Sequence, residues 1–121
     1  MKENQGKISK IDCNKRLANI DDALYVIGGK WKLKVIIALQ DGGNMRFNEL
    51  QRKVEGISAR VLSKELKDLE ENGFVTRKVY IETMPILVEY ITTNYSQSLH
   101  EVIMVLADWG ENHKRKIISE M

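Results

Sequence analysis

Basic and hydroxyl side chains gather on one side of a helical segment in the middle of the chain. At about 100° per residue, Arg60, Lys64 and Lys67 lie within about 60° of one another. Ser58 begins this segment and Ser63 flanks the basic face. Such groups can hydrogen-bond phosphate oxygens and the edges of base pairs in the major groove. The pattern therefore predicts a DNA contact through the first turns of this helix.

The same face has a plainer interpretation, because most amphipathic helices simply expose their charged side to water. The opposite side is apolar and carries Leu62, Leu66 and Leu69. Acidic residues gather in the last turns, at Asp68, Glu70 and Glu71, which favours the first turns as the contact. Glu65 lies beside the apolar stripe and fits neither interpretation.

Three further cations are candidate phosphate contacts. Arg77 and Lys78 lie on a predicted strand, and Arg46 stands at the start of a predicted short helix. Each would add salt-dependent affinity rather than sequence specificity. The alternative is that these charges are only solvated.

The sequence shows no comparable pattern for catalysis or metal binding. No set of nucleophile, base and orienting group is visible, so we expect no enzyme. Gly28-Gly29-Lys30 lacks the spacing and the following Ser or Thr of a phosphate-binding P-loop. His100 and His113 would lie about 20 Å apart along one helix, too far to share a metal within a subunit. We therefore expect neither a metal nor a cofactor.

Apolar periodicity predicts the helices and strands that carry these residues. We expect helices over residues 16–27, 30–40, 47–54, 58–72 and about 94–120, and strands over 74–81 and 86–92. The third and fourth helices, joined by a turn containing Gly56, form a helix-turn-helix unit. The two strands form a hairpin whose tip, residues 82–85, holds the single proline. The expected class is mainly α with a small β-hairpin (α+β), in the winged helix-turn-helix arrangement.

Length and composition fit one small globular domain. The chain has 121 residues with a formal charge of +2, too slight by itself to indicate a nucleic-acid partner. Residues 1–15 are polar and lack periodicity, so we expect a flexible arm followed by one domain over 16–121. No segment resembles a membrane span or a signal peptide, so the expected location is cytoplasmic.

The last predicted helix indicates a second subunit. Its apolar stripe comprises Leu99, Val102, Ile103, Leu106, Trp109 and Ile117. A domain this small cannot cover so long a stripe from within, so we expect a homodimer.

Several short motifs occur together in a fixed order. They are Ile-Gly-Gly-Lys-Trp at 27–31, Arg-Phe-Asn-Glu-Leu at 46–50, Gly-Ile-Ser at 56–58, Leu-Ser-Lys-Glu-Leu at 62–66, Leu-Glu-Glu-Asn-Gly at 69–73, Val-Glu-Tyr at 88–90 and Trp-Gly at 109–110. With them the chain resembles, from about residue 24 to about residue 110, the HxlR-type family of bacterial winged helix-turn-helix transcriptional regulators. The resemblance implies a homodimer, formed by N- and C-terminal helices, that binds operator DNA and responds to an unidentified small-molecule effector.

Two positions depart from the family pattern. Some members sense oxidants through a cysteine just before the first helix, where this chain has Ala18 and Asn19. Cys13, the single cysteine, lies earlier and is a candidate redox sensor, with an uninvolved thiol as the alternative. The basic wing residue that usually precedes Val-Glu-Tyr is here Leu87, so the wing tip lacks that charge.

Two functions therefore remain open. The first is a homodimeric regulator that binds double-stranded DNA at specific promoter or operator sequences. The alternative is a winged-helix module for protein–protein interaction without sequence-specific DNA binding. Salt titration distinguishes them, because phosphate contacts weaken steeply as salt rises.

Overall fold

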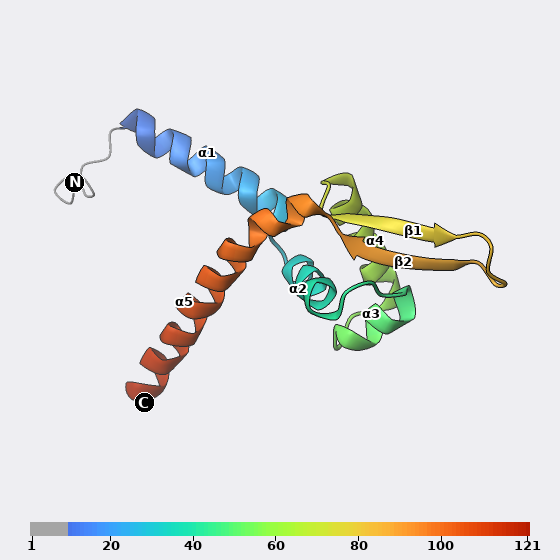
Figure 1. Cartoon of the computed structure of the whole chain (residues 1–121). Coiled ribbons are helices and arrows are strands. Elements are labelled where there is room, and N and C mark those ends of the chain that lie inside the picture. The colour runs from blue at the N-terminus through green and yellow to red at the C-terminus, as the bar shows by residue number, and fades with distance from the viewer. Residues whose placement is uncertain (1–9) are drawn as a thin grey trace.

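The computed structural model describes residues 10–121 (Figure 1). In chain order the elements are α1 (Lys10–Ile27), α2 (Lys32–Gly42), α3 (Phe47–Lys53), α4 (Ala59–Glu71), β1 (Val75–Tyr80), β2 (Leu87–Thr92), the 3₁₀-helix η2 (Asn94–Leu99) and α5 (His100–Ser119). Helices α2, α3 and α4 pack together beside the base of the β1–β2 hairpin.

The hydrophobic core lies among these three helices and the hairpin base. Its buried apolar side chains are Val35, Ile36, Ala38, Leu39, Leu50, Val54, Ile57, Leu62, Leu66, Leu69, Phe74, Val75 and Leu99. The predicted inner face of α4 is confirmed, because Leu62 and Leu69 are fully buried and Leu66 is nearly so. Burying this face fixes the direction in which the opposite, basic face of α4 points.

Local chemistry sets the start of α4. Gly56 adopts a φ of 88° in the turn after α3, a left-handed conformation that favours glycine. Ser58 then caps the helix, and its Oγ accepts a hydrogen bond from the backbone N–H of Val61 at 3.1 Å. The expected cap and turn are both confirmed.

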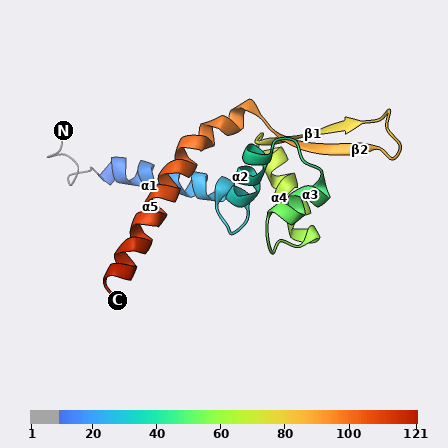
Figure 2. The same ribbon diagram turned by 60° about the horizontal axis from the view of Figure 1, so that its bottom comes forward.

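The two strands form an antiparallel hairpin that runs in register from Val75–Thr92 to Tyr80–Leu87. Met45 extends the pairing beside β2: its N–H donates to the carbonyl of Tyr90, and its carbonyl accepts from the N–H of Tyr90. The hairpin projects from the helices at one end of the molecule (Figure 2). This arrangement confirms the winged helix-turn-helix fold.

Two predicted boundaries are wrong. Residues 10–15, expected in the flexible arm, form the start of α1, so the expected domain boundary falls inside a helix; residues 1–9 lie outside the described part. The side chains of residues 12–16 are exposed and form no apolar stripe, and Asp12 in the first turn of α1 interacts favourably with the helix dipole.

The last helix begins differently from the prediction. Residues 94–99 form a 3₁₀-helix before α5 starts. Thr93 caps this segment, and the N–H of Ser96 donates to the Thr93 carbonyl three residues earlier, which is the 3₁₀ pattern.

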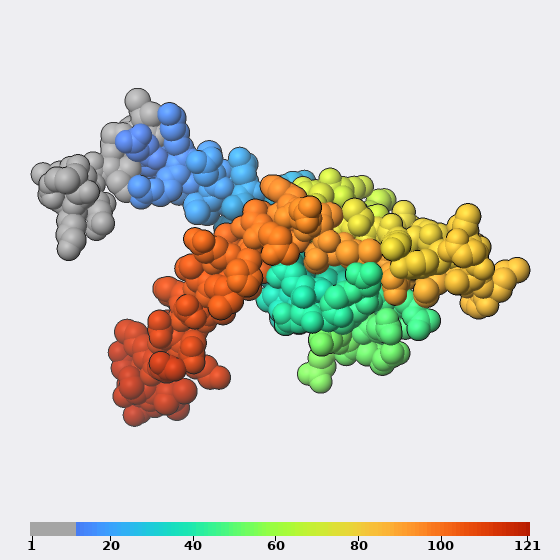
Figure 3. All heavy atoms as spheres, in the orientation of Figure 1, coloured from blue at the N-terminus to red at the C-terminus, as the bar shows by residue number. Residues whose placement is uncertain are grey.

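Helices α1 and α5 leave the core as two separate arms (Figure 3). No residue of α5 is buried, and several large apolar side chains are half-exposed or more on the two arms: Leu17, Ile20, Leu24, Tyr25, Val105, Leu106, Trp109 and Ile118. None of the helices within residues 10–121 combines the length and apolar character needed to cross a bilayer.

Candidate nucleic-acid interface

The outer face of α4 carries the predicted basic residues. Arg60, Ser63, Lys64 and Lys67 are all exposed, opposite the buried leucines. The structure therefore brings these four side chains to one surface, as the helical spacing predicted. Ser58 is also exposed, but it lies at the start of the helix, where its hydroxyl oxygen already accepts the capping hydrogen bond.

The cations on this face differ in their partners. Lys64 Nζ lies 3.2 Å from Asp68 Oδ2, an ion pair one turn along the helix. Within the part of the chain that the structure describes, Arg60 and Lys67 form no ion pair. These two side chains can therefore bind a phosphate without giving up an internal partner.

A nearly buried ion pair joins α2 to the side of α4. Lys32 Nζ lies 2.8 Å from Glu65 Oε1, and the two side chains are 13% and 12% exposed. The hydrogen bond to Glu65 is the main reason that the pKa of Lys32 is raised above its ordinary value. This pair explains the position of Glu65 beside the apolar stripe, which sequence reasoning left unexplained because its partner lies 33 residues earlier.

Asp68 connects this pair to the outer face. Its carboxylate lies 3.4 Å from Lys32 Nζ as well as near Lys64. Burial opposes ionisation of Asp68, but the hydrogen bonds and charges of the two lysines outweigh it, so its pKa is lowered. Asp68 is therefore ionised at neutral pH and offsets part of the charge of Lys64.

Arg77 and Lys78 lie on opposite faces of the hairpin, because successive strand residues alternate. Arg77 faces α4, where its Nε donates to Glu70 Oε2 at 3.0 Å. The ammonium of Lys78 instead lies 5.2 Å from the ring centroid of Tyr80. The two predicted phosphate contacts therefore do not act on one surface.

An open groove of about 550 Å³ runs between α4 and the hairpin. It is lined by Ser63, Leu66, Lys67, Glu70, Glu71, Val75, Thr76, Arg77 and Tyr90. The groove thus joins three of the predicted contact residues, from two elements, around one space.

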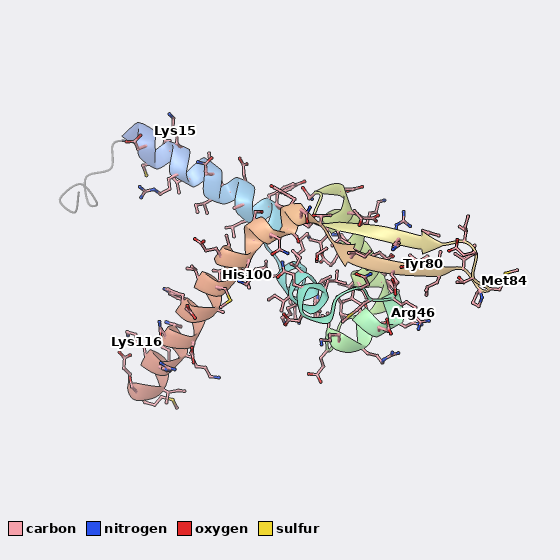
Figure 4. All side chains as sticks on the ribbon, viewed as in Figure 1. Lys15, Arg46, Tyr80, Met84, His100 and Lys116 are labelled. Atoms are coloured by element: carbon pink, nitrogen blue, oxygen red, sulfur yellow. The ribbon has the colours of Figure 1, made fainter. Side chains whose placement is uncertain are left out.

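Arg46 lies apart from that groove, at the start of α3 beside the outer half of the hairpin (Figure 4). Its side chain is 60% exposed and stands 3.9 Å from Glu49 Oε1. It lines a second groove, of about 410 Å³, together with Pro85, Ile86 and Leu87. Leu87 therefore supplies an apolar wall where the family pattern has a cation.

The outer half of the hairpin carries no positive charge. No lysine, arginine or histidine occurs from residue 79 to residue 99. Met84, at the tip, is 95% exposed, and Ile81 and Ile86 are also exposed (Figure 4). The basic side chains of the hairpin are therefore confined to Arg77 and Lys78.

Cys13 is exposed and lies within α1, not in a flexible arm. His113 stacks on Trp109 one turn away, with ring centroids 5.0 Å apart. Within residues 10–121, no group of three or more His, Cys, Asp or Glu side chains is placed to hold a metal ion.

Two regulators are similar in sequence to this chain. An HTH-type transcriptional regulator of Methanothermobacter thermautotrophicus is 38% identical over 95 residues, covering 78% of this chain and 71% of that protein. The HTH-type transcriptional regulator YdeP of Bacillus subtilis is 39% identical over 98 residues, covering 81% and 75%.

The chain is also similar to a solved structure of a regulator. The reduced form of the redox regulator HypR superposes with a TM-score of 0.74 at 36% identity, covering 84% of this chain and 98% of that one. The family model described as HxlR-like helix-turn-helix matches residues 26–117. With the helix-turn-helix unit of α3 and α4, the β1–β2 hairpin and these matches in agreement, the chain belongs to the HxlR-like helix-turn-helix family of transcriptional regulators.

Proposed function

We propose that this protein is a homodimer that binds double-stranded DNA at specific promoter or operator sequences and thereby regulates transcription in the cytoplasm. The observation that carries the proposal is the outer face of α4, where Arg60 and Lys67 are exposed and form no ion pair with any of residues 10–121. The family of transcriptional regulators supports the same conclusion. We propose no catalytic role.

The first turns of α4 would enter the major groove. Arg60 and Ser63 lie on its exposed face and can reach base edges or phosphates. Lys67 and Arg77, which line the groove between α4 and the hairpin, would contact the sugar–phosphate backbone. Base contacts then set sequence preference, and phosphate contacts supply most of the affinity.

A second copy would cover the apolar faces of α1 and α5. Leu17, Ile20 and Leu24 share one side of α1, and each is more than half exposed in the single chain. Leu106 and Trp109 expose 50% and 65% of their surface on α5. A symmetric dimer would place two copies of α4 in successive major grooves, about 34 Å apart.

Selection of bound duplexes from genomic DNA tests this proposal. The expected consensus has twofold symmetry, with half-site centres about one helical turn apart. Arg60→Ala and Lys64→Ala should weaken binding to the selected duplex in a gel-shift assay while circular dichroism stays unchanged. Failure to enrich any sequence would overturn the proposal.

One observation favours the alternative, a module that binds another protein. Lys64, Arg77 and Arg46 all have acidic neighbours, and the outer wing is apolar. A salt titration of duplex binding separates the two functions. Affinity that falls steeply with salt supports the DNA-binding regulator, whereas weak binding without sequence preference supports the module.

A further inference from the structure

We propose that Glu70 is a positioning residue, which orients the guanidinium of Arg77 toward a backbone phosphate seated in the groove between α4 and the hairpin. The inference rests on the proposed DNA-binding function and deepens it. It starts from a contact between two elements: Glu70 lies in the last turn of α4, Arg77 lies on β1, and Glu70 Oε2 accepts a hydrogen bond from Arg77 Nε at 3.0 Å.

The contact uses one edge of the guanidinium. The Nε–H points to Glu70, and the structure gives the two terminal Nη groups no partner within residues 10–121. A guanidinium is planar, so fixing the Nε edge also fixes the direction of its Nη donors. Arg77 remains 55% exposed while Glu70 is 30% exposed, which leaves the arginine as the more accessible partner.

The groove around this pair is lined by further groups that can donate hydrogen bonds to a phosphate. Lys67 and Ser63 line the same space from α4, adding an ammonium and a hydroxyl donor. Tyr90 pairs with Arg77 across the strands and lies on the same side. Burial is the main cause of its raised pKa, which the charge of Arg77 opposes and that of Glu70 increases. Both charges of the pair therefore act inside this groove.

A carboxylate beside a polyanion would normally weaken binding. The direction in which DNA affinity changes when Glu70 is removed therefore tests its role. If Glu70 only repels DNA, removing it raises affinity. If it orients Arg77, removing it lowers affinity, because the arginine loses the geometry in which its Nη donors face the phosphate.

Glu71 provides a matched control. It is adjacent to Glu70 on the same helix and lines the same groove, but no hydrogen bond joins it to Arg77. Glu70→Ala and Glu71→Ala remove the same charge with the same change in helix propensity. On a duplex selected from genomic DNA, we expect Glu70→Ala to reduce affinity about threefold to tenfold, and Glu71→Ala to leave it unchanged or raise it slightly.

The Arg77→Ala background distinguishes positioning from a general structural role. There Glu70 has no arginine to orient, so Glu70→Ala should no longer reduce affinity and should raise it through lost repulsion. A reduction that persists in this background, or equal effects of the two single glutamate variants, would overturn the inference. If the wild-type protein bound no duplex, the proposed function would fail and this inference with it.

Discussion

Apolar side chains are buried in the core of α2, α3, α4 and the hairpin, but they are exposed on the two arms, α1 and α5. In the core, Val35, Ile36, Leu50 and Leu62 are completely buried by other parts of the same chain. On α5 no residue is buried, and Trp109 exposes 65% of its surface. The core is therefore buried by contacts within one subunit, whereas the apolar side chains of the arms would leave water only in the proposed dimer.

The difference also separates two tasks. The core holds the basic face of α4 in a fixed direction, while the arms would set the distance between two such faces in a dimer. Substitutions in the core should therefore change folding, and those on the arms should change assembly.

A core substitution should produce the largest effect. Leu62→Ala removes a fully buried side chain between α4 and its neighbours, and we expect it to cost about 2–5 kcal/mol in unfolding free energy. Urea denaturation at fixed protein concentration measures the cost. A loss below about 1 kcal/mol would contradict the assignment of Leu62 to the core.

A substitution on an arm should dissociate the dimer without unfolding the subunit. Leu106→Glu places a charge on the apolar stripe of α5, and we expect the dimer dissociation constant to rise at least about a hundredfold. Sedimentation velocity measures this change.

Met104→Glu is the matched control for that experiment. Met104 and Leu106 are 48% and 50% exposed, but two residues apart on a helix they face opposite sides. Met104→Glu should leave the dimer intact. Equal dissociation by both variants would contradict the proposed dimer face.

The Lys32–Glu65 ion pair should contribute less to the unfolding free energy than the buried Leu62 side chain. Glu65→Gln leaves a nearly buried ammonium with only the more distant carboxylate of Asp68, and we expect a loss of about 1–3 kcal/mol in unfolding free energy. The control Glu71→Gln, at an exposed position, should change it by less than about 0.5 kcal/mol. Equal losses would show that the pair does not stabilise the fold.

The same pair predicts a pH dependence. Because the pKa of Lys32 is raised above 10.5, its stabilisation is present at neutral pH and is lost as pH rises beyond that value. Glu65→Gln should reduce this alkaline loss of stability. A loss of equal size in the wild type and the variant would contradict the role of the pair.

Removing one cation from α4 should have the smallest effect. Arg60→Ala should weaken binding to the selected duplex about tenfold, with unchanged unfolding free energy. Arg115→Ala removes the same charge from α5 and should leave affinity within about twofold of the wild type. Equal losses in both variants would indicate a general charge effect in place of a specific contact.

Sequence reasoning located what depends on local pattern. The buried face of α4 and the Ser58 cap follow from spacing and residue type within a few positions. The start of α1 was missed because residues 12–16 are mostly polar and exposed, so they show no apolar periodicity.

Ion pairs within one helix can be inferred from sequence spacing, whereas ion pairs between separate elements cannot. Lys64 and Asp68 lie four residues apart, so their pairing could have been inferred from helical spacing. The contacts of Lys32 with Glu65 and of Glu70 with Arg77 require the packing of separate elements, which one sequence does not reveal. Arg77 and Lys78 are a different case, because the alternation of successive strand residues, a local pattern, already places them on two faces.

The salt dependence of DNA binding tests the central claim, that the outer face of α4 meets DNA phosphates in each subunit of a dimer. The measurement compares the wild type with the Arg60→Ala/Lys67→Ala double variant on one selected duplex. Losing two phosphate contacts in each of two subunits should reduce the slope of log affinity against log salt by about 3 to 4. An unchanged slope would contradict the account, because the basic face of α4 would then not be in contact with DNA.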